Sequence, residues 1–305
     1  MTDASLPSSN HLRGIVLVLL AVFLFACQDT MGKYLFAKHS VPFVQAIRYG
    51  VNLFLIMVIF APRYGFGFMR TDRPVLAITR GLALALGSLT GGLALRVMPL
   101  AEMNSILYLN PLIVLFLAQP LLGEKVRWFS WIAAGLGFAG LLFIVRPGSN
   151  LPTIGMVYAF LCLITAVIYP LLSRLLSKTE STQTLMFYVG MAGTVYYFAQ
   201  LPWTIPATAP SLFDGTLMVA IGVVSFVGHS LFTAAYARAP VSLLAPFTYV
   251  HIAWATLLGW IVFNQAPEYL TFIGISLVAL AGVGNAVMNH KTAAAAQLAP
   301  IEVEV

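Results

Sequence analysis

Hydrophobic positions in this chain form long uninterrupted runs, separated by short links rich in proline, glycine and charged residues. A helix needs about 20 apolar residues to cross a bilayer, and each run has about that length. The pattern therefore predicts an all-α polytopic membrane protein with ten transmembrane helices and no extramembrane domain. The ten runs cover residues 14–33, 42–61, 74–95, 100–122, 128–146, 154–175, 182–202, 214–236, 241–263 and 268–289.

The two halves of the chain resemble each other. Adding 141 to a position in the first half repeatedly leads to the same residue type in the second half. Each half holds five predicted spans, so the second half must enter the membrane from the opposite side, and the chain is predicted to be an inverted repeat. We expect a first five-helix repeat over residues 14–148 and a second over residues 154–290. The matches include Gly81 and Gly222, Gly87 and Gly228, Pro99 and Pro240, and Tyr108 and Tyr249.

Composition agrees with this interpretation and excludes a soluble globular protein. The 305 residues are 60% hydrophobic and only 9% charged, and their mean hydropathy is +0.92. The formal charge of +6 comes from basic residues scattered over the links, not from a basic run with interleaved aromatic residues. A lipid bilayer is therefore an expected partner and nucleic acid is not.

Basic residues also predict the orientation, because cytoplasmic links carry more lysine and arginine than external links. With the N-terminus inside, the inner links hold most of them, so residues 1–13 and a disordered tail over 291–305 are expected to be cytoplasmic. Arg48 and Arg80 lie within predicted spans. The inner set is Arg13, Arg63, Arg70, Arg73, Lys125, Arg127, Arg174, Lys178, Arg238 and Lys291; the outer set is Lys33, Lys38, Arg96 and Arg146.

Several predicted spans carry polar side chains that a helix facing lipid would not need. An amide or a phenol in hydrocarbon costs free energy without a partner, so such groups tend to face a bundle interior or a wet cavity. Pro111 also interrupts the fourth span. Aromatic and polar stripes on four spans predict a central pocket for a planar ligand, and helix-packing surface is the alternative for any single stripe. The expected substrate-binding residues are Asn104, Tyr108, Asn110, Tyr158, Tyr169, His229, Tyr236, Tyr249, His251 and Trp254.

Charged residues form a second group of candidates, with a role in gating or coupling. Asp29 and Lys33 are one helical turn apart and can neutralise each other. Asp29, Arg48 and Glu102 fall at similar depth, which predicts an ion-paired cluster serving as an outer gate or a substrate contact; a static pair is the alternative. If transport is proton-coupled, Asp29 is the preferred proton carrier, and facilitated diffusion stays open. The candidates are Asp29, Lys33, Arg48 and Glu102.

The segments MPLAE, LNPL, LLGEK and GFAGLLFIVRPG, which follow one another from Met98 to Gly148, resemble the EamA-like branch of the drug/metabolite transporter superfamily. The resemblance covers the chain apart from its tails. It implies a secondary transporter of a small organic metabolite in the bacterial inner membrane, with a cavity lined by the first four helices of each half. In this family the fifth and tenth helices can form a homodimer contact. The second half has Asn264-Gln265 where the first has Gly123-Glu124, so a symmetric role for Glu124 is not implied.

The opening FLFACQDTMGKYL, together with PLAE and RPG, is most similar to bacterial members that take up riboflavin or S-adenosylmethionine. Riboflavin uptake is the first expectation, because an aromatic and largely neutral pocket suits a flavin. The alternative is S-adenosylmethionine, an amino acid or another metabolite, moved in either direction.

Other functional classes fit the pattern less well. The histidines are too dispersed for paired metal-binding boxes, and Asp29 is the only aspartate in the interior of a predicted span, so no intramembrane dyad is expected. No phosphate-binding loop of the P-loop type is present. We therefore expect no catalytic residues, no metal and no cofactor. A membrane-embedded enzyme or a channel is the alternative of a different class.

Overall fold

The computed structural model describes residues 8–97, 103, 106–107, 109–123, 126–145, 152–264 and scattered helical positions between 269 and 288. Every regular element in this part of the chain is a helix. Six stretches are long and apolar enough to cross a membrane, which identifies a multi-pass membrane protein. The elements are α1 (Ser8–Phe36), α2 (Val41–Tyr64), η1 (Gly65–Met69), α3 (Pro74–Val97), α5 (Asn110–Leu122), α6 (Trp128–Val145), α7 (Thr153–Leu176), α8 (Thr182–Phe198), α9 (Leu201–Thr204), α10 (Leu212–Arg238), α11 (Val241–Leu244), η2 (Ala245–Tyr249) and α12 (Val250–Phe263).

Three predicted spans differ from the helices that the structure contains. The fourth span is described only in part, and α5 begins within it at Asn110, so Pro111 lies in a first turn, where its missing N–H costs no helical bond. The seventh span is divided into α8 and α9, with Pro202 in the first turn of α9. The ninth span is not one continuous α-helix. Pro246 cannot donate to the preceding turn, and the chain passes through the 3₁₀ segment η2 between α11 and α12.

Helix ends repeat at the same offset of 141 residues that relates the two halves of the sequence. α2 begins at Val41 and α8 at Thr182. α5 ends before Gly123 and α12 before Asn264, and both residues have left-handed backbone, with φ of 68° and 54°. Glycine adopts this conformation freely, and asparagine tolerates it better than most residues do. The change from glycine to asparagine therefore leaves the helix end unaltered.

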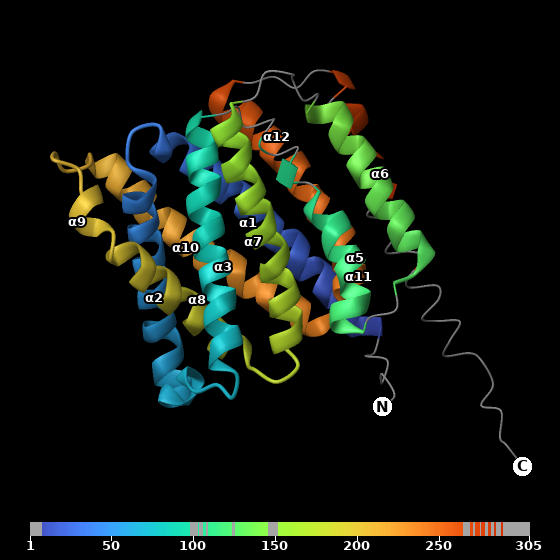
Figure 1. Ribbon diagram of the computed structural model, residues 1–305, viewed down its shortest axis with the longest axis horizontal. Coiled ribbons are helices and arrows are strands. Elements are labelled where there is room, and N and C mark those ends of the chain that lie inside the picture. Colours follow the sequence, from blue (N-terminus) through green and yellow to red (C-terminus); the bar gives the residue numbers. More distant parts are fainter. Residues whose placement is uncertain are drawn as a thin grey trace, which may run out of the picture.

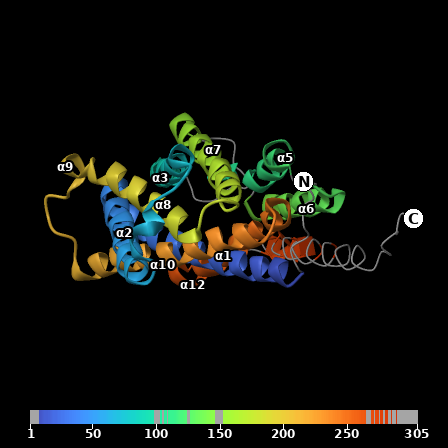
Figure 2. The same ribbon diagram turned by 90° about the horizontal axis from the view of Figure 1, so that it is seen from below.

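The helices form two layers, and each layer combines helices from both halves of the chain. Figure 2 shows α3, α5 and α7 on one side and α1, α10 and α12 on the other, with α2 and α8 at one edge. In Figure 1 the long helices stand side by side. Contacts between helices occur in matched pairs: α1–α10 with α3–α7, α1–α12 with α5–α7, and α2–α10 with α3–α8. Under the offset, each contact of a pair corresponds to the other.

Two glycines related by the offset allow close helix crossings. A β-carbon on Gly81 of α3 would lie 2.6 Å from the carbonyl oxygen of Tyr188 and 2.8 Å from the β-carbon of Ala192, both in α8. A β-carbon on Gly222 of α10 would lie 2.6 Å from the β-carbon of Val51 in α2. Ala192 and Val51 are also 141 positions apart, so the two crossings are equivalent. Small residues at such points are typical of tightly packed membrane helices.

Gly81→Ala should destabilise the bundle by about 1–3 kcal/mol, because the Tyr188 carbonyl belongs to a helix backbone and cannot move aside. Gly135→Ala in α6 is the matched control, since nothing lies within 4 Å of a β-carbon built at Gly135. Thermal unfolding of both purified variants in detergent measures the difference. Equal melting temperatures would show that the crossing of α3 and α8 is loosely packed.

Candidate functional site

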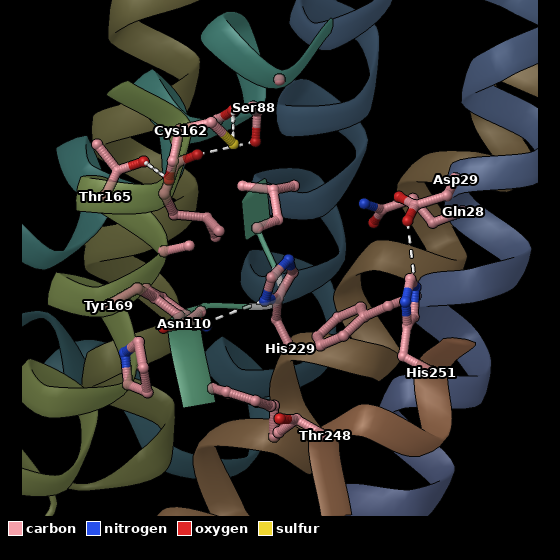
Figure 3. A pocket seen from close by; sticks show the side chains of 18 of the residues that line it. Gln28, Asp29, Ser88, Asn110, Cys162, Thr165, Tyr169, His229, Thr248 and His251 are labelled. Atoms are coloured by element: carbon pink, nitrogen blue, oxygen red, sulfur yellow. Dashed lines mark hydrogen bonds and ion pairs between the residues drawn. The ribbon is translucent and has the colours of Figure 1, made fainter. Parts of the chain in front are cut away.

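A cavity of about 340 Å³ lies between the two layers. Its walls come from α1, α2, α3, α5, α7, α10, η2 and α12. Pockets that bind small organic molecules have volumes of about 300–1,000 Å³, so the cavity has room for a metabolite. Figure 3 shows Asp29 on one wall, Cys162 and Tyr169 on the opposite wall, and His229 between them.

The cavity brings together predicted residues from both halves of the chain. Seven of them line it: Asn110, Tyr169, His229, Tyr236 and His251 from the expected binding residues, and Asp29 and Arg48 from the gate candidates. Asn104, Tyr108 and Glu102 lie outside the described residues.

Two expected binding residues on η2 and α12 face other helices instead of the cavity. Tyr249 is fully buried, and its ring occupies the space beside Gly137 of α6, where a β-carbon would come within 2.5 Å of it. Trp254 packs edge-on against Phe23, with 4.9 Å between the ring centroids. Both aromatic rings serve packing between helices.

Tyr158 and Lys33 also lie outside the cavity lining. Tyr158 packs against a buried cluster that includes Ala94 and Cys162. Lys33 places its ammonium nitrogen 4.5 Å above the ring centre of Phe263. The polar stripes predicted from sequence are present, but their helices are rotated so that some members face neighbouring helices.

Asp29 forms an ion pair at the edge of the cavity. Its Oδ2 lies 3.1 Å from Nε2 of His251, which links α1 to α12. The dashed line in Figure 3 marks this pair, beside Gln28. The Asp29 side chain is 49% exposed and lines the cavity.

Arg48 on α2 supplies a positive charge to the same cavity. Its Nη2 donates to Oγ of Ser88 at 2.8 Å, and its guanidinium lies 4.5 Å over the ring of Tyr49. Arg48 is only 3% exposed and its Nε has no hydrogen-bond partner. In the described part of the chain, the ion pairs involve Asp29 and Asp214, and neither includes Arg48.

Carboxamide oxygens in the cavity are also without partners. Oε1 of Gln28, Oε1 of Gln45 and Oδ1 of Asn110 are buried and accept no hydrogen bond from the protein. Buried polar atoms are nearly always satisfied in folded proteins, and exceptions need an explanation such as a ligand or a water molecule. All three side chains line the cavity, so its wall contains buried acceptors that no donor of the protein uses.

Arg80 on α3 is completely buried behind the cavity wall, and it is not among the residues predicted for the site. Its hydrogen bonds reach α7, α8 and α10, so a single side chain connects the two layers and α8. A charge within an apolar span was the only signal in the sequence. Nε donates to Ser173 Oγ at 2.8 Å, Nη1 to the Leu185 carbonyl at 2.9 Å, and Nη2 to Tyr169 Oη at 3.1 Å and Thr233 Oγ1 at 2.7 Å.

Tyr169 connects Arg80 to the aromatic side of the cavity. Its hydroxyl lies 3.2 Å from Nδ1 of His229, and its ring stacks on Phe232 at a centroid distance of 5.6 Å. The His229 ring lies in turn 4.7 Å from the ring of Phe25. The orientation of His229 therefore depends on the buried guanidinium, through one phenol.

Tyr169→Phe should destabilise the protein by about 1–3 kcal/mol, because it leaves a buried N–H of Arg80 and Nδ1 of His229 without a partner. Tyr158→Phe is the control, since the Tyr158 hydroxyl makes no hydrogen bond within the described part of the chain. Melting temperatures in detergent measure both effects. A Tyr169→Phe variant as stable as Tyr158→Phe would show that the Tyr169 hydroxyl does not stabilise Arg80 and His229.

A charged cluster lies at the end of the bundle where α1 finishes. Nε2 of His39 is 3.0 Å from Oδ2 of Asp214, and Nζ of Lys38 is 3.7 Å from Oδ1. Lys38 also donates to the Tyr34 hydroxyl, and this bond, followed by the Asp214 carboxylate, raises the pKa of Lys38 above its ordinary value. The cluster fastens the link between α1 and α2 to the first turn of α10.

The protein is a membrane bundle of two matched halves around a cavity with a partly polar lining. The profile of the EamA-like transporter family matches residues 12–146 and again residues 153–285. The chain belongs to the EamA-like transporter family. This confirms the resemblance seen in the sequence, and the two matches begin 141 residues apart, as the internal offset predicts.

Curated relatives of this EamA-family chain are transporters with different substrates. It is 26% identical to the S-adenosylmethionine uptake transporter of Rickettsia bellii, covering 87% of this chain and 90% of that one. It is 27% identical to the pseudopaline exporter CntI of Pseudomonas aeruginosa, with 88% and 94% covered. It is 26% identical to the riboflavin transporter of Rhizobium johnstonii, with 91% and 92% covered.

A solved crystal structure shows the same fold. It superimposes with a TM-score of 0.77, at 20% identity, covering 93% of this chain and 99% of the other. The relatives indicate a transporter of small metabolites, and they do not agree on one substrate.

Proposed function

We propose that this protein is a secondary transporter that moves a small organic metabolite across a bacterial inner membrane by alternating access. In this proposal the ten helices form a five-plus-five inverted repeat with both termini in the cytoplasm. The family, the matched helix contacts and the cavity between the layers support it. Riboflavin uptake stays a prediction beside the alternatives, S-adenosylmethionine and other metabolites.

One observation carries the mechanism: the Arg80 cluster is held together by hydrogen bonds, and the equivalent positions of the other repeat line the cavity. The cluster around Arg80 is closed: side chains of α7 and α10 and a backbone carbonyl of α8 accept hydrogen bonds from the guanidinium. At the offset of 141, its members Arg80, Tyr169, Ser173 and Thr233 correspond to Ile221, Gln28, Gly32 and Gly92, and all four counterparts line the cavity.

The cavity also extends toward one end of the bundle. Along α3 it begins at Ala83, just beyond Arg80, and continues to Leu95 in the last turn. Along α1 it reaches Phe36, the final residue of the helix. The Arg80 cluster thus closes one side of the site. When inverted repeats exchange conformations, the other end closes and this cluster must open.

Ala166→Cys, in a background with Cys27→Ser and Cys162→Ala, tests this proposal by labelling a small residue of the cavity wall. A membrane-impermeant maleimide should modify Cys at position 166 faster from the side where α1 ends. Adding Arg80→Met should increase labelling from the opposite side by about tenfold, because breaking a buried network of this kind costs a few kcal/mol. Right-side-out and inside-out vesicles provide the two sides.

Arg48→Met is the matched control, since it also removes a buried arginine from a span but leaves the Arg80 cluster intact. It should not increase labelling from the side closed by Arg80. Labelling that is equal from both sides in the parent, or unchanged by Arg80→Met, would contradict a gate at Arg80.

A further inference from the structure

We infer that the substrate of this site is an aminocarboxylate, meaning a metabolite that carries a carboxylate and a cationic nitrogen. The carboxylate binds Arg48, and the nitrogen binds beside Asp29 and the unpartnered carboxamide oxygens. This assignment rests on the proposed transport function and names the chemical class of its substrate.

Arg48 carries a buried charge that the protein compensates only in part. A guanidinium in a transmembrane bundle is costly unless an anion or hydrogen bonds compensate it, and such residues commonly mark substrate pathways. Arg48 is only 3% exposed, and within the described part of the chain its one hydrogen bond runs from Nη2 to the Ser88 hydroxyl at 2.8 Å. The Nε atom of Arg48 has no hydrogen-bond partner, and the Arg48 residue lines the cavity. A planar carboxylate fits two adjacent N–H groups of a guanidinium better than a neutral oxygen does.

Arg80 shows what a compensated guanidinium looks like in the same bundle. Four acceptors surround it, and it does not line the cavity. Arg48 has no such set of acceptors, although it is almost as deeply buried. Arg80 is therefore satisfied by the protein itself, whereas Arg48 is left to a ligand.

The other polar groups of the cavity call for hydrogen-bond donors. Asp29 contributes a half-exposed carboxylate, and Gln28, Gln45 and Asn110 each contribute a buried carboxamide oxygen without a partner. An ammonium group supplies several N–H donors and a positive charge, so it suits Asp29 and a neighbouring amide together. Gln45 and Arg48 lie three residues apart on α2 and both contact Ser88, so acceptor and donor functions occur on the same wall.

Riboflavin satisfies this lining less completely. Its ring system can stack on the aromatic side near Phe25 and His229, but it has no carboxylate for Arg48 and no cation for Asp29. An aminocarboxylate with an attached ring uses both parts of the cavity. The charge pattern therefore favours this class over a neutral flavin.

The test measures thermal stabilisation of the purified protein by matched pairs of ligands. Each pair contains an acid and its decarboxylated amine: S-adenosylmethionine with decarboxylated S-adenosylmethionine, methionine with 3-methylthiopropylamine, and histidine with histamine. Riboflavin is tested alongside. In the wild-type protein, at least one acid should bind at least about tenfold more tightly than its amine, because a buried charge pair contributes that much or more.

Arg48→Met should reduce this preference to within about threefold, since the variant can no longer distinguish the carboxylate. Arg238→Met is the control: this arginine, at the end of α10, donates to the Ala234 carbonyl and does not line the cavity, so the preference should persist. Equal binding of every acid and its amine overturns the assignment. So does stabilisation by riboflavin alone, or by no member of the panel.

The labelling experiment at position 166 needs no ligand, so the two proposals can fail separately. If no acid binds more tightly than its amine but position 166 is labelled from one side only, the substrate class is rejected and the transport proposal stands. Labelling that is equal from both sides rejects the gating mechanism, whatever the panel shows.

Discussion

A guanidinium buried in an apolar bundle must be solvated by the bundle itself, and much of this structure depends on how Arg80 meets that requirement. In the part of the chain that the structure describes, hydroxyl groups and one backbone carbonyl accept its hydrogen bonds, and no carboxylate pairs with it. Because the acceptors come from α7, α8 and α10, the guanidinium of Arg80 determines where these helices meet α3. The cavity begins beyond that point, and its aromatic wall is oriented through Tyr169.

The helical architecture was largely predictable, because the internal repeat relates the positions of helix ends as well as residue types. The same offset relates the left-handed residues Gly123 and Asn264, and the crossings at Gly81 and Gly222. The interruption at Pro246 was not predictable in form. A proline inside an apolar run shows that a helical bond is lost, but neighbouring helices decide whether the chain kinks or tightens into a 3₁₀ turn.

The existence of a polar cavity was predictable from the sequence, but only some of the residues that line it were. Polar residues in apolar spans were predicted to avoid lipid, because hydrocarbon does not tolerate unpartnered polar groups. The predicted binding residues Tyr169 and His229 line the cavity, and so does Asp29, which was predicted as a gate or coupling residue. Tyr249 has the same signature, yet it packs against Gly137, since one sequence does not reveal how a helix is rotated against its neighbours. The partners of Arg80 lie about 90 to 150 residues away along the chain, so its role could be seen only in the folded structure.

The most direct test of the central claim is a pair of distances across the two ends of the bundle. Spin labels at Ala37 and Thr153 report on one end, and labels at Leu12 and Lys178, which are their counterparts at the offset of 141, report on the other. All four positions are exposed. Pulsed electron paramagnetic resonance should show the 12–178 distance lengthening and the 37–153 distance shortening when Arg80 is replaced by methionine. Distances that change in the same direction, or do not change, would contradict alternating access through this cavity.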